Sequence, residues 1–300
     1  MAGPRLDPKE ANLLYHDAAA RSYDDKWAIS FDDRGLRYVR ERAERMLPER
    51  RYRRVLEVGC GTGFFILNLW QAGFVDEPHA CDLSPGMLAV CAENARRIGC
   101  DIRLQTGDAE RLPFPDGSFD LVVGHAFLHH LPNPHLALAE ARRVLRPGGA
   151  ILFAGEPTER GDRLARAVGR LTWRTFRAAA AAAPALRRPP EPESGGGRVL
   201  RDLEWDVDLH TFPPSRIEAM AQQRGFTAVR VETEELIASV FGWAVRTIEA
   251  EVRPGLLGPR WAGFAYLGWR ALYAVDHRLL YRVVPKDRFY NLLLYGERRG

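Results

Sequence analysis

One segment, Val-Leu-Glu-Val-Gly-Cys-Gly-Thr-Gly at residues 55–63, constrains the fold of this chain more than any other. Its apolar and β-branched start is typical of a buried strand. Alternating glycines follow, and an apolar helical pattern begins near Phe64. Such a turn lets the backbone approach a ligand closely, because no Cβ atom stands in the way. The third glycine of the dinucleotide fingerprint G-x-G-x-x-G is missing, which argues against a nicotinamide-dependent oxidoreductase.

Strand and helix patterns alternate around this turn. Near-continuous apolar strands separated by helices are typical of a parallel sheet with helices on both faces, in which ligands bind at the carboxyl ends of the strands. We therefore predict an α/β, Rossmann-like, doubly wound and mostly parallel seven-stranded sheet. The expected strands are 54–58, 78–82, 101–106, 119–125, 149–155, 227–231 and 291–295, and the expected helices between them include 62–72, 84–97, 134–146 and 213–225.

Acidic residues and turn motifs follow these strands. Asp82, in Cys-Asp-Leu-Ser, stands about twenty residues after the glycines, where a carboxylate accepts hydrogen bonds from ribose hydroxyls. Asp108 follows the third strand in Thr-Gly-Asp-Ala. The fourth strand leads into Leu-His-His-Leu at 128–131, and the helix before the fifth strand ends in Arg-Pro-Gly-Gly at 146–149, which is typical helix-termination chemistry.

Together these motifs resemble the class I S-adenosylmethionine (SAM)-dependent methyltransferases, and within them the type 11 group of small-molecule enzymes that includes quinone-biosynthesis methyltransferases. The resemblance is dense over residues 54–156 and thin outside them. It implies SAM as the cofactor and methyl transfer to an O or C nucleophile of a small hydrophobic acceptor, such as a lipid or quinone precursor. The alternative is a non-catalytic SAM-binding or partner-binding protein.

The resemblance also assigns residues to the methionine end of SAM. Gly59 and Gly61 would permit close backbone approach, and Glu57 would orient this part of the cofactor. The backbone carbonyl of His125 would receive the methionine ammonium group. For Glu57, a helix-capping role or an ion pair with Arg54 remains an alternative.

At the adenosine end, Asp82 would bind the ribose hydroxyls, with Leu83 and Met87 beside the adenine. Asp108 would accept a hydrogen bond from the adenine amine, and the Ala109 N–H would donate one to a ring nitrogen of the adenine. The alternative for both acids is a solvated loop carboxylate.

Four residues are candidates for a general base. His129 and His130 follow the fourth strand, and histidine titrates near neutral pH, which suits proton removal. Glu156, at the end of the fifth strand, and His210, further along the chain, are the others. An alternative is that a histidine ring here only bonds to backbone. Two neighbouring histidines without a third ligand do not make a metal site, so no metal is expected.

Four regions are expected. The helical segments 11–23 and 37–46 form a leader over the cofactor cleft, in which Tyr15 and Tyr23 either cover SAM or pack the leader against the sheet. The last strand is expected to be antiparallel and at the sheet edge. The regions are 1–53 (leader), 54–156 (SAM-binding core), 157–205 (cap helix 160–183 and flexible linker 187–197) and 206–300 (rest of the core sheet, with a two-helix insertion at 234–284).

The insertion carries the evidence on the acceptor. Its aromatic side chains either pack the two helices together or line a pocket for an apolar acceptor. The helix at 160–183 has an apolar sector beside arginines, so it either contacts an anionic membrane or is a solvated cap. A monomer or weak dimer is expected. The insertion aromatics are Phe241, Trp243, Trp261, Phe264, Tyr266, Trp269 and Tyr273.

Composition sets further bounds. The formal net charge is +4 and is carried almost wholly by arginine, with no basic run beside an RNA-recognition pattern, so no nucleic-acid partner is expected. The cysteines form no C-x-x-C pair and are expected to be buried thiols in a reducing compartment; a thiol-based arsenic methyltransferase site is the alternative. There is no apolar signal-peptide run at the start and no uncharged run of about twenty residues, so we expect a cytoplasmic protein. The cysteines are Cys60, Cys81, Cys91 and Cys100.

Overall fold

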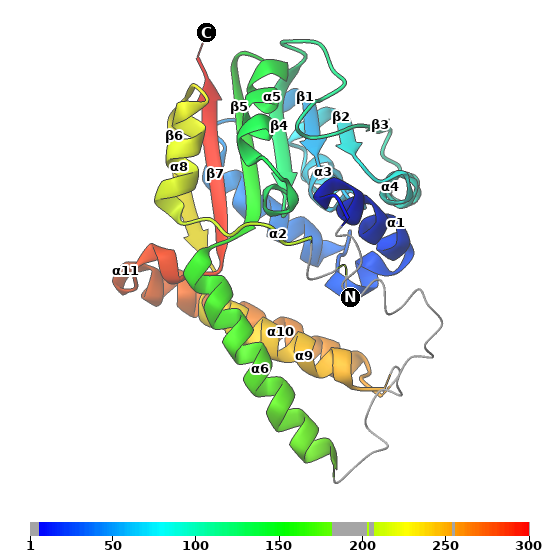
Figure 1. Ribbon diagram of the computed structural model, residues 1–300, viewed down its shortest axis with the longest axis vertical. Helices are drawn as coiled ribbons and strands as arrows, with labels where there is room; N and C mark the ends of the chain where they lie inside the picture. Colours follow the sequence, from blue (N-terminus) through cyan, green and yellow to red (C-terminus); the bar gives the residue numbers. More distant parts are fainter. Residues whose placement is uncertain (1–5, 182–202, 204–206, 254–255, 300) are drawn as a thin grey trace.

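A computed structural model of the 300-residue chain describes residues 6–181, 203, 207–253 and 256–299 (Figure 1). Within these residues, the centre is a seven-stranded sheet of order β3-β2-β1-β4-β5-β7-β6. β1 to β5 run parallel, and β7 is antiparallel to both its neighbours. The predicted Rossmann-like sheet is confirmed. The strands are β1 Tyr52–Val58, β2 Val75–Asp82, β3 Arg103–Thr106, β4 Phe119–His125, β5 Leu145–Pro157, β6 Phe226–Glu234 and β7 Asn291–Arg298.

Helices cover both faces of the sheet. Successive strand side chains point to opposite faces, so Leu121 and Val123 enter one core cluster while Val122 enters the other. The first cluster lies under α2 and α3 and includes Met46 and Phe65. The second lies under α5 and α8. These helices and α4 are α2 Asp33–Met46, α3 Phe64–Gln71, α4 Pro85–Ile98, α5 Pro134–Val144 and α8 Pro214–Gln223.

The position predicted for the last strand is wrong. β7 is antiparallel, as expected, but it lies between β5 and β6, and β6 forms the edge. The reason is in the side chains: Leu292, Leu293 and Leu294 of β7 are fully buried, which suits a strand with neighbours on both sides. β6 instead carries Arg230 and Glu232, and charged residues are typical of edge strands.

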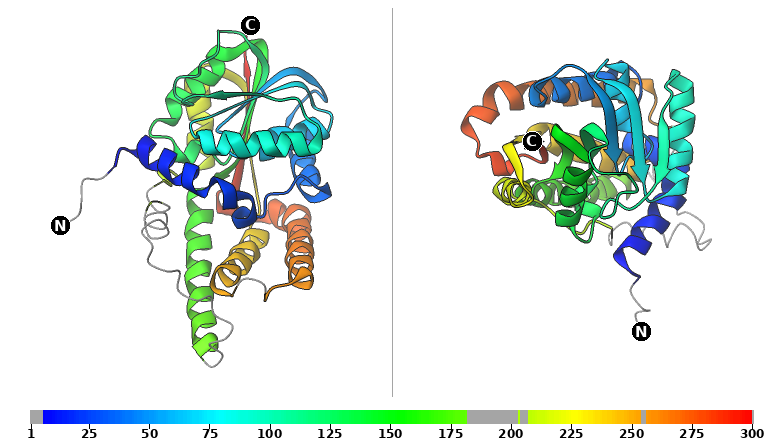
Figure 2. Two further views of the ribbon diagram at one scale, coloured as in Figure 1. Left: turned by 90° about the vertical axis from the view of Figure 1, so that its right-hand side faces the viewer. Right: turned by 90° about the horizontal axis from the view of Figure 1, so that it is seen from above.

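Three longer helices extend from the carboxyl-end side of the sheet (Figure 1), and α9 lies between the other two (Figure 2). α6 (Glu159–Ala181) follows β5, and α9 (Ile237–Glu251) follows β6. α10 (Pro259–Val275) continues through a π-helical turn, Asp276–Leu280, into α11 (Tyr281–Val283). The cap helix and the two insertion helices therefore form where the sequence predicted them. The predicted linker 187–197 lies outside the described residues.

The leader helix α1 (Pro8–Trp27) runs alongside α4 (Figure 2). It is longer than the segment 11–23 expected from the sequence. The Asp7 side chain caps its first turn by accepting a hydrogen bond from the Lys9 N–H, and Pro8 suits the first helical position. Ala28, in the left-handed conformation, ends it. No described helix is long and apolar enough to cross a bilayer.

Candidate active site

The glycine turn after β1 has the backbone that glycine favours. Gly59, Gly61 and Gly63 have φ angles of 62°, 50° and 87°. A Cβ at Gly59 would lie 2.7 Å from Cβ of Phe127, and one at Gly63 would lie 2.6 Å from Sγ of Cys91. A Cβ at Gly61 would meet nothing within 4 Å, so this turn faces open space there. The turn therefore offers backbone that a ligand can approach closely.

Glu57 is buried beneath this turn. One carboxylate oxygen accepts a hydrogen bond from the Ile66 N–H at 3.0 Å, in the first turn of α3. Burial raises the pKa of Glu57 well above its usual range, and this hydrogen bond opposes the rise only in part. The contact is the helix-capping one that the sequence left open, while Arg54 is paired with Glu77 instead, at 3.8 Å. The role of Glu57 toward the methionine part remains a prediction.

Asp82, at the end of β2, joins the glycine turn to the start of α4. Oδ2 accepts a hydrogen bond from the Gly61 N–H at 2.8 Å, and Oδ1 accepts one from the Ser84 N–H at 2.9 Å. Each carboxylate oxygen keeps a further lone pair for a hydroxyl donor. Leu83 beside it is half-buried, whereas Met87 is fully buried against Ala20 of α1.

Asp108 meets the leader helix. Its Oδ2 lies 2.6 Å from Nζ of Lys9, and its Oδ1 accepts a hydrogen bond from the Glu110 N–H at 2.8 Å. Nζ of Lys9 also lies 2.6 Å from Oε2 of Glu110. Ala109, between the two acids, packs into the core with Leu112. Lys9 is not among the predicted site residues; the available signal was a lysine at the start of the leader in a chain whose only lysines are Lys9, Lys26 and Lys286.

Further contacts hold α1 over the strand ends. Oδ1 of Asp17 accepts hydrogen bonds from the Ser84 hydroxyl at 2.9 Å and from the Gly86 N–H at 2.7 Å, at the N-terminus of α4. Tyr15 packs against Val207, and Tyr23 packs against Met87. These contacts favour the packing interpretation of both tyrosines.

His125 ends β4 in an aromatic enclosure. Its ring stacks on Phe65 and meets Phe64 edge-on, with centroids 5.6 and 5.3 Å away. The Tyr38 hydroxyl lies 3.1 Å from Nε2 of His125. Burial lowers the pKa of this imidazole to about 4, so the ring is neutral at physiological pH. The predicted role of the backbone carbonyl is not tested by these contacts.

Glu156 and His129 form a buried pair at the end of β5. Oε1 of Glu156 accepts hydrogen bonds from the N–H groups of Phe127 and Leu128, at 3.0 and 2.9 Å. Its Oε2 accepts from the backbone N–H and from Nδ1 of His129, at 3.1 and 2.8 Å. Burial acts against both charges, but the pairing outweighs it, so the pKa of Glu156 is lowered and that of His129 is raised. Glu156 is thus engaged with four donors, which favours a positioning role over proton removal.

His130 and His210 have different surroundings. Nδ1 of His130 donates to the Val207 carbonyl at 3.0 Å, and burial lowers its pKa well below the usual range. This is the backbone-bonded arrangement that the sequence left open. The His210 backbone N–H donates to the His129 carbonyl at 3.1 Å, and Nε2 of His210 is buried without a hydrogen-bond partner in the described part of the chain.

Asp208 joins the histidine pair, which the sequence did not predict. Its Oδ1 lies 3.7 Å from Nε2 of His129 and 3.4 Å from Nδ1 of His130. The three side chains offer ligand atoms within 4.8 Å of one another, so the third group that the sequence lacked is present. Nδ1 of His130 carries the proton given to the Val207 carbonyl, so this nitrogen is not available as a metal ligand in the observed arrangement.

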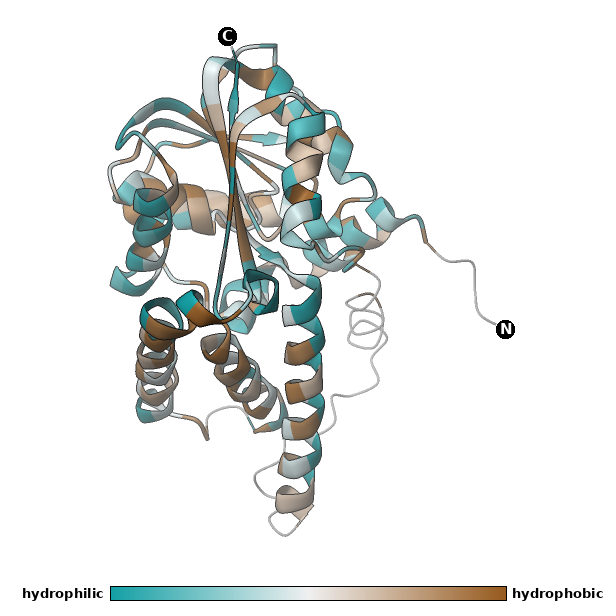
Figure 3. Ribbon diagram, turned by 90° about the vertical axis from the view of Figure 1, so that its left-hand side faces the viewer, coloured by the Kyte–Doolittle hydropathy of each residue, from teal (hydrophilic) through white to brown (hydrophobic). Residues whose placement is uncertain are grey.

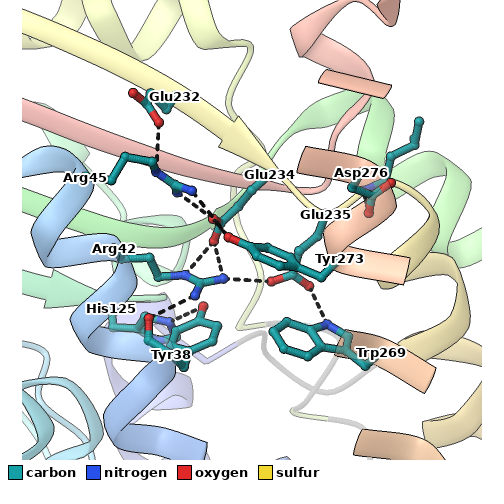
Figure 4. A network of polar contacts seen from close by, with 11 residues as sticks. Tyr38, Arg42, Arg45, His125, Glu232, Glu234, Glu235, Trp269, Tyr273 and Asp276 are labelled. Carbon is teal, nitrogen blue, oxygen red and sulfur yellow. Dashed lines mark hydrogen bonds and ion pairs between the residues drawn. The ribbon is translucent and has the colours of Figure 1, made fainter. Parts of the chain in front are cut away.

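A buried polar network connects His125 to the insertion (Figure 4). The fully buried Arg42 of α2 donates from Nε to Glu234 at 2.6 Å, and its Nη2 lies 3.2 Å from Oε1 of Glu235. Tyr38, one turn before Arg42 on α2, holds His125. On the other side, Trp269 of α10 donates to Glu235 at 3.2 Å. The network therefore ties α10 to the end of β4.

The insertion aromatics contact one another. Phe264 lies 5.6 Å, between ring centroids, from both Phe241 and Trp261. Trp269 stacks on Tyr273 at 5.1 Å. Of these contacts, the one between Phe241 and Phe264 joins α9 to α10, which favours helix packing for these two rings. The four cysteines are all buried and free, as the sequence predicted.

The core of the chain is similar to known methyltransferase sequences. A sequence profile described as a methyltransferase domain matches residues 56–153. Over 118 residues the chain is 35% identical to a demethylmenaquinone methyltransferase of Thermus thermophilus, covering 39% of this chain and 54% of that protein. Over 155 residues it is 37% identical to a malonyl-(acyl-carrier protein) O-methyltransferase of Halorhodospira halophila, covering 50% and 51%. The chain thus spans about half the length of these curated relatives.

Solved structures agree on the fold. A phosphoethanolamine N-methyltransferase of Haemonchus contortus, in complex with SAM, superposes with a TM-score of 0.61 at 16% identity, covering all of this chain and 62% of that one. The (4+2)-cyclase SpnF superposes with a TM-score of 0.59 at 18% identity, covering 100% and 99%. At these identities the likeness shows the fold alone.

The sheet, the glycine turn and the acids at the strand ends define residues 56–153 as a class I SAM-dependent methyltransferase domain. The same region is similar to demethylmenaquinone methyltransferases and malonyl-(acyl-carrier protein) O-methyltransferases.

Proposed function

We propose that the whole chain is a SAM-dependent methyltransferase acting on an O or C nucleophile of a small hydrophobic acceptor. The observation that carries the proposal is the position of three groups at the strand ends. The Gly61 backbone, beside open space, is bonded to Asp82, and Asp108 follows β3 on the same side of the sheet. These donors and acceptors fit a nucleoside with a charged amino-acid tail.

SAM, when bound, would supply an electrophilic methyl group: the acceptor nucleophile would attack the methyl carbon in line with the C–S bond, and S-adenosylhomocysteine would leave with the electron pair of that bond. The task of the protein is then to bind, align and, for a hydroxyl or carbon acid, remove a proton. Asp82 would accept hydrogen bonds from the ribose hydroxyls, and Asp108 would accept one from the adenine amine. Nε2 of His129 is the best-placed proton acceptor, because Glu156 fixes the proton on Nδ1 and leaves the other nitrogen free to accept.

The positions of the helices after β5 and β6 support an apolar methyl acceptor. α6 and α9 follow β5 and β6 at the same end of the sheet as the glycine turn, so a helical layer that includes the apolar helix α9 stands beside the site. Lipid and quinone precursors fit such surroundings. The buried, free cysteines support a reducing setting such as the cytoplasm.

Calorimetric titration of the whole chain with SAM, with S-adenosylhomocysteine and with NADH tests the cofactor. Binding of the first two and not of NADH is expected; binding of NADH alone would point to an oxidoreductase. Transfer of radiolabelled methyl to apolar hydroxylated and carbon-acid acceptors then tests catalysis. SAM binding without transfer to any acceptor would favour the non-catalytic alternative.

A further inference from the structure

The outer helix α10 is mostly apolar, yet none of its residues is buried. Its sequence, Pro-Arg-Trp-Ala-Gly-Phe-Ala-Tyr-Leu-Gly-Trp-Arg-Ala-Leu-Tyr-Ala-Val, contains two arginines and no acidic residue. A helix with so few charged residues is normally enclosed by protein or lipid. α9 covers one side of α10, where Phe241 meets Phe264, and another side carries exposed apolar residues in the described part of the chain.

The uncovered side carries an apolar stripe. Its members recur four or eight residues apart, so they share one face of α10 and its continuation into α11. Figure 3 shows the hydrophobic colouring of these outer helices. The stripe and its exposed fractions are Leu267 63%, Val275 36%, Leu279 62% and Val283 77%.

Positive charge accompanies the stripe. Asp276 is the only acidic residue between 256 and 286, and it is buried and engaged. It accepts hydrogen bonds from the N–H groups of Leu236, Ile237 and Ala238, which caps α9. The exposed arginines beside the stripe make no ion pair with a described residue. They are Arg260, Arg270, Arg278 and Arg282.

The helix for which the sequence suggested membrane contact differs on this point. On α6, Arg163 pairs with Glu159 and Arg166 pairs with Asp162. Part of its basic face is therefore neutralised by acids of the same helix. The stripe on α10 and α11 combines apolar exposure with arginines that no acid among the described residues pairs with.

We propose that the stripe of α10 and α11 lies on an anionic lipid bilayer. Its leucines and valines would enter the boundary between headgroups and acyl chains, and the arginines would contact lipid phosphates. Charge complementarity favours this occupant over a second copy of the chain, since two such surfaces facing each other would place arginines against arginines. The proposal is independent of the methyl-transfer activity.

Co-sedimentation of the whole chain with vesicles tests it. We expect binding to phosphatidylcholine vesicles containing phosphatidylglycerol, little binding to pure phosphatidylcholine, and weakening as salt rises. Leu267→Glu should reduce binding roughly tenfold or more, because it removes buried apolar area and adds a repelled charge. Leu136→Glu is the matched control, since Leu136 is an exposed leucine, 44% accessible, on α5.

The charge contribution has its own variants. Arg278→Gln combined with Arg282→Gln should weaken binding to the anionic vesicles about thirtyfold, at roughly 1 kcal/mol per arginine. Arg51→Gln combined with Arg53→Gln, at exposed arginines away from the stripe, should have little effect. Absence of vesicle binding at low salt, or equal effects of Leu267→Glu and Leu136→Glu, would overturn the proposal. A dimer in light scattering that Leu267→Glu dissociates, without vesicle binding, would assign the stripe to a second copy.

Discussion

Lys9 and Asp108 form a direct ion pair, with Nζ 2.6 Å from Oδ2. The leader helix thereby places a cation against the carboxylate that the methyltransferase resemblance assigns to the adenine amine. Glu110 shares the same ammonium group. Two donors, the lysine and the adenine amine, would therefore compete for one carboxylate when the cofactor binds.

Replacing Lys9 with Met should increase SAM affinity. Both partners of the pair are about one-third exposed, and such pairs contribute up to about 1 kcal/mol. The Kd for SAM should therefore fall by up to about fivefold. Calorimetric titration measures it, with Lys286→Met as the control at a lysine outside the site. A loss of affinity in Lys9→Met would instead show that Lys9 helps to hold the cofactor.

Changing Asp82 to Asn should weaken SAM binding about tenfold to 150-fold, the effect of losing a hydrogen bond to a charged group worth roughly 1.5–3 kcal/mol. The amide oxygen can still accept from the Gly61 or Ser84 N–H, so the turn should persist. The Kd for S-adenosylhomocysteine and the melting temperature should be measured together. Unchanged affinity in a folded Asp82→Asn variant would remove Asp82 from the site.

The raised pKa of His129 should appear in the pH profile of activity. If neutral His129 removes the proton, kcat/KM should rise with pH to a midpoint above about 6.5, the ordinary value for histidine. Glu156→Gln removes the negative partner that favours the imidazolium, so the midpoint should move to lower pH. Glu140→Gln, at a carboxylate bonded to Arg143, should leave the midpoint in place. A merely structural role for Glu156 predicts lower stability with an unchanged midpoint.

The same pair should contribute to stability over a limited pH range. The pKa of His129 is raised in the folded state, so its protonated ring stabilises the fold at low pH. This contribution is lost as pH rises through the folded-state pKa. The pKa of Glu156 is lowered in the folded state, so its carboxylate stabilises the fold above about pH 4.5. This contribution is lost as pH falls through the folded-state pKa. Denaturant unfolding of the wild type and of His129→Gln should therefore differ most between about pH 4.5 and 6.5.

Arg42→Met should destabilise the fold by about 3–5 kcal/mol at neutral pH, because it leaves Glu234 and Glu235 buried with their main counter-charge removed. The loss should shrink below about pH 4.5, where neutral carboxyls no longer need the arginine. Urea unfolding at both pH values measures it. Arg51→Met, at an exposed pair with Asp76, should change stability by less than about 1 kcal/mol; a similar loss in both variants would contradict a special role for the buried network.

The sequence by itself determined the parts of the site that depend on local patterns. The apolar run and glycines at 55–63 specify a strand and a tight turn, and the alternation of strands and helices specifies a parallel sheet whose carboxyl ends meet at one side. Asp82 and Asp108 follow from their places after β2 and β3 in that alternation. These features needed only neighbouring residues, because backbone conformation and hydrophobic periodicity are local properties of the chain.

Only the tertiary structure decided how distant segments meet at this site. It placed Lys9 on Asp108, Asp208 beside the histidine pair, and β7 inside the sheet instead of at its edge. The partners lie tens of residues apart in the chain, and nothing in the local sequence specifies which side chain a carboxylate will face. Packing of the helices and strands brings these segments together, and that packing is a property of the whole fold.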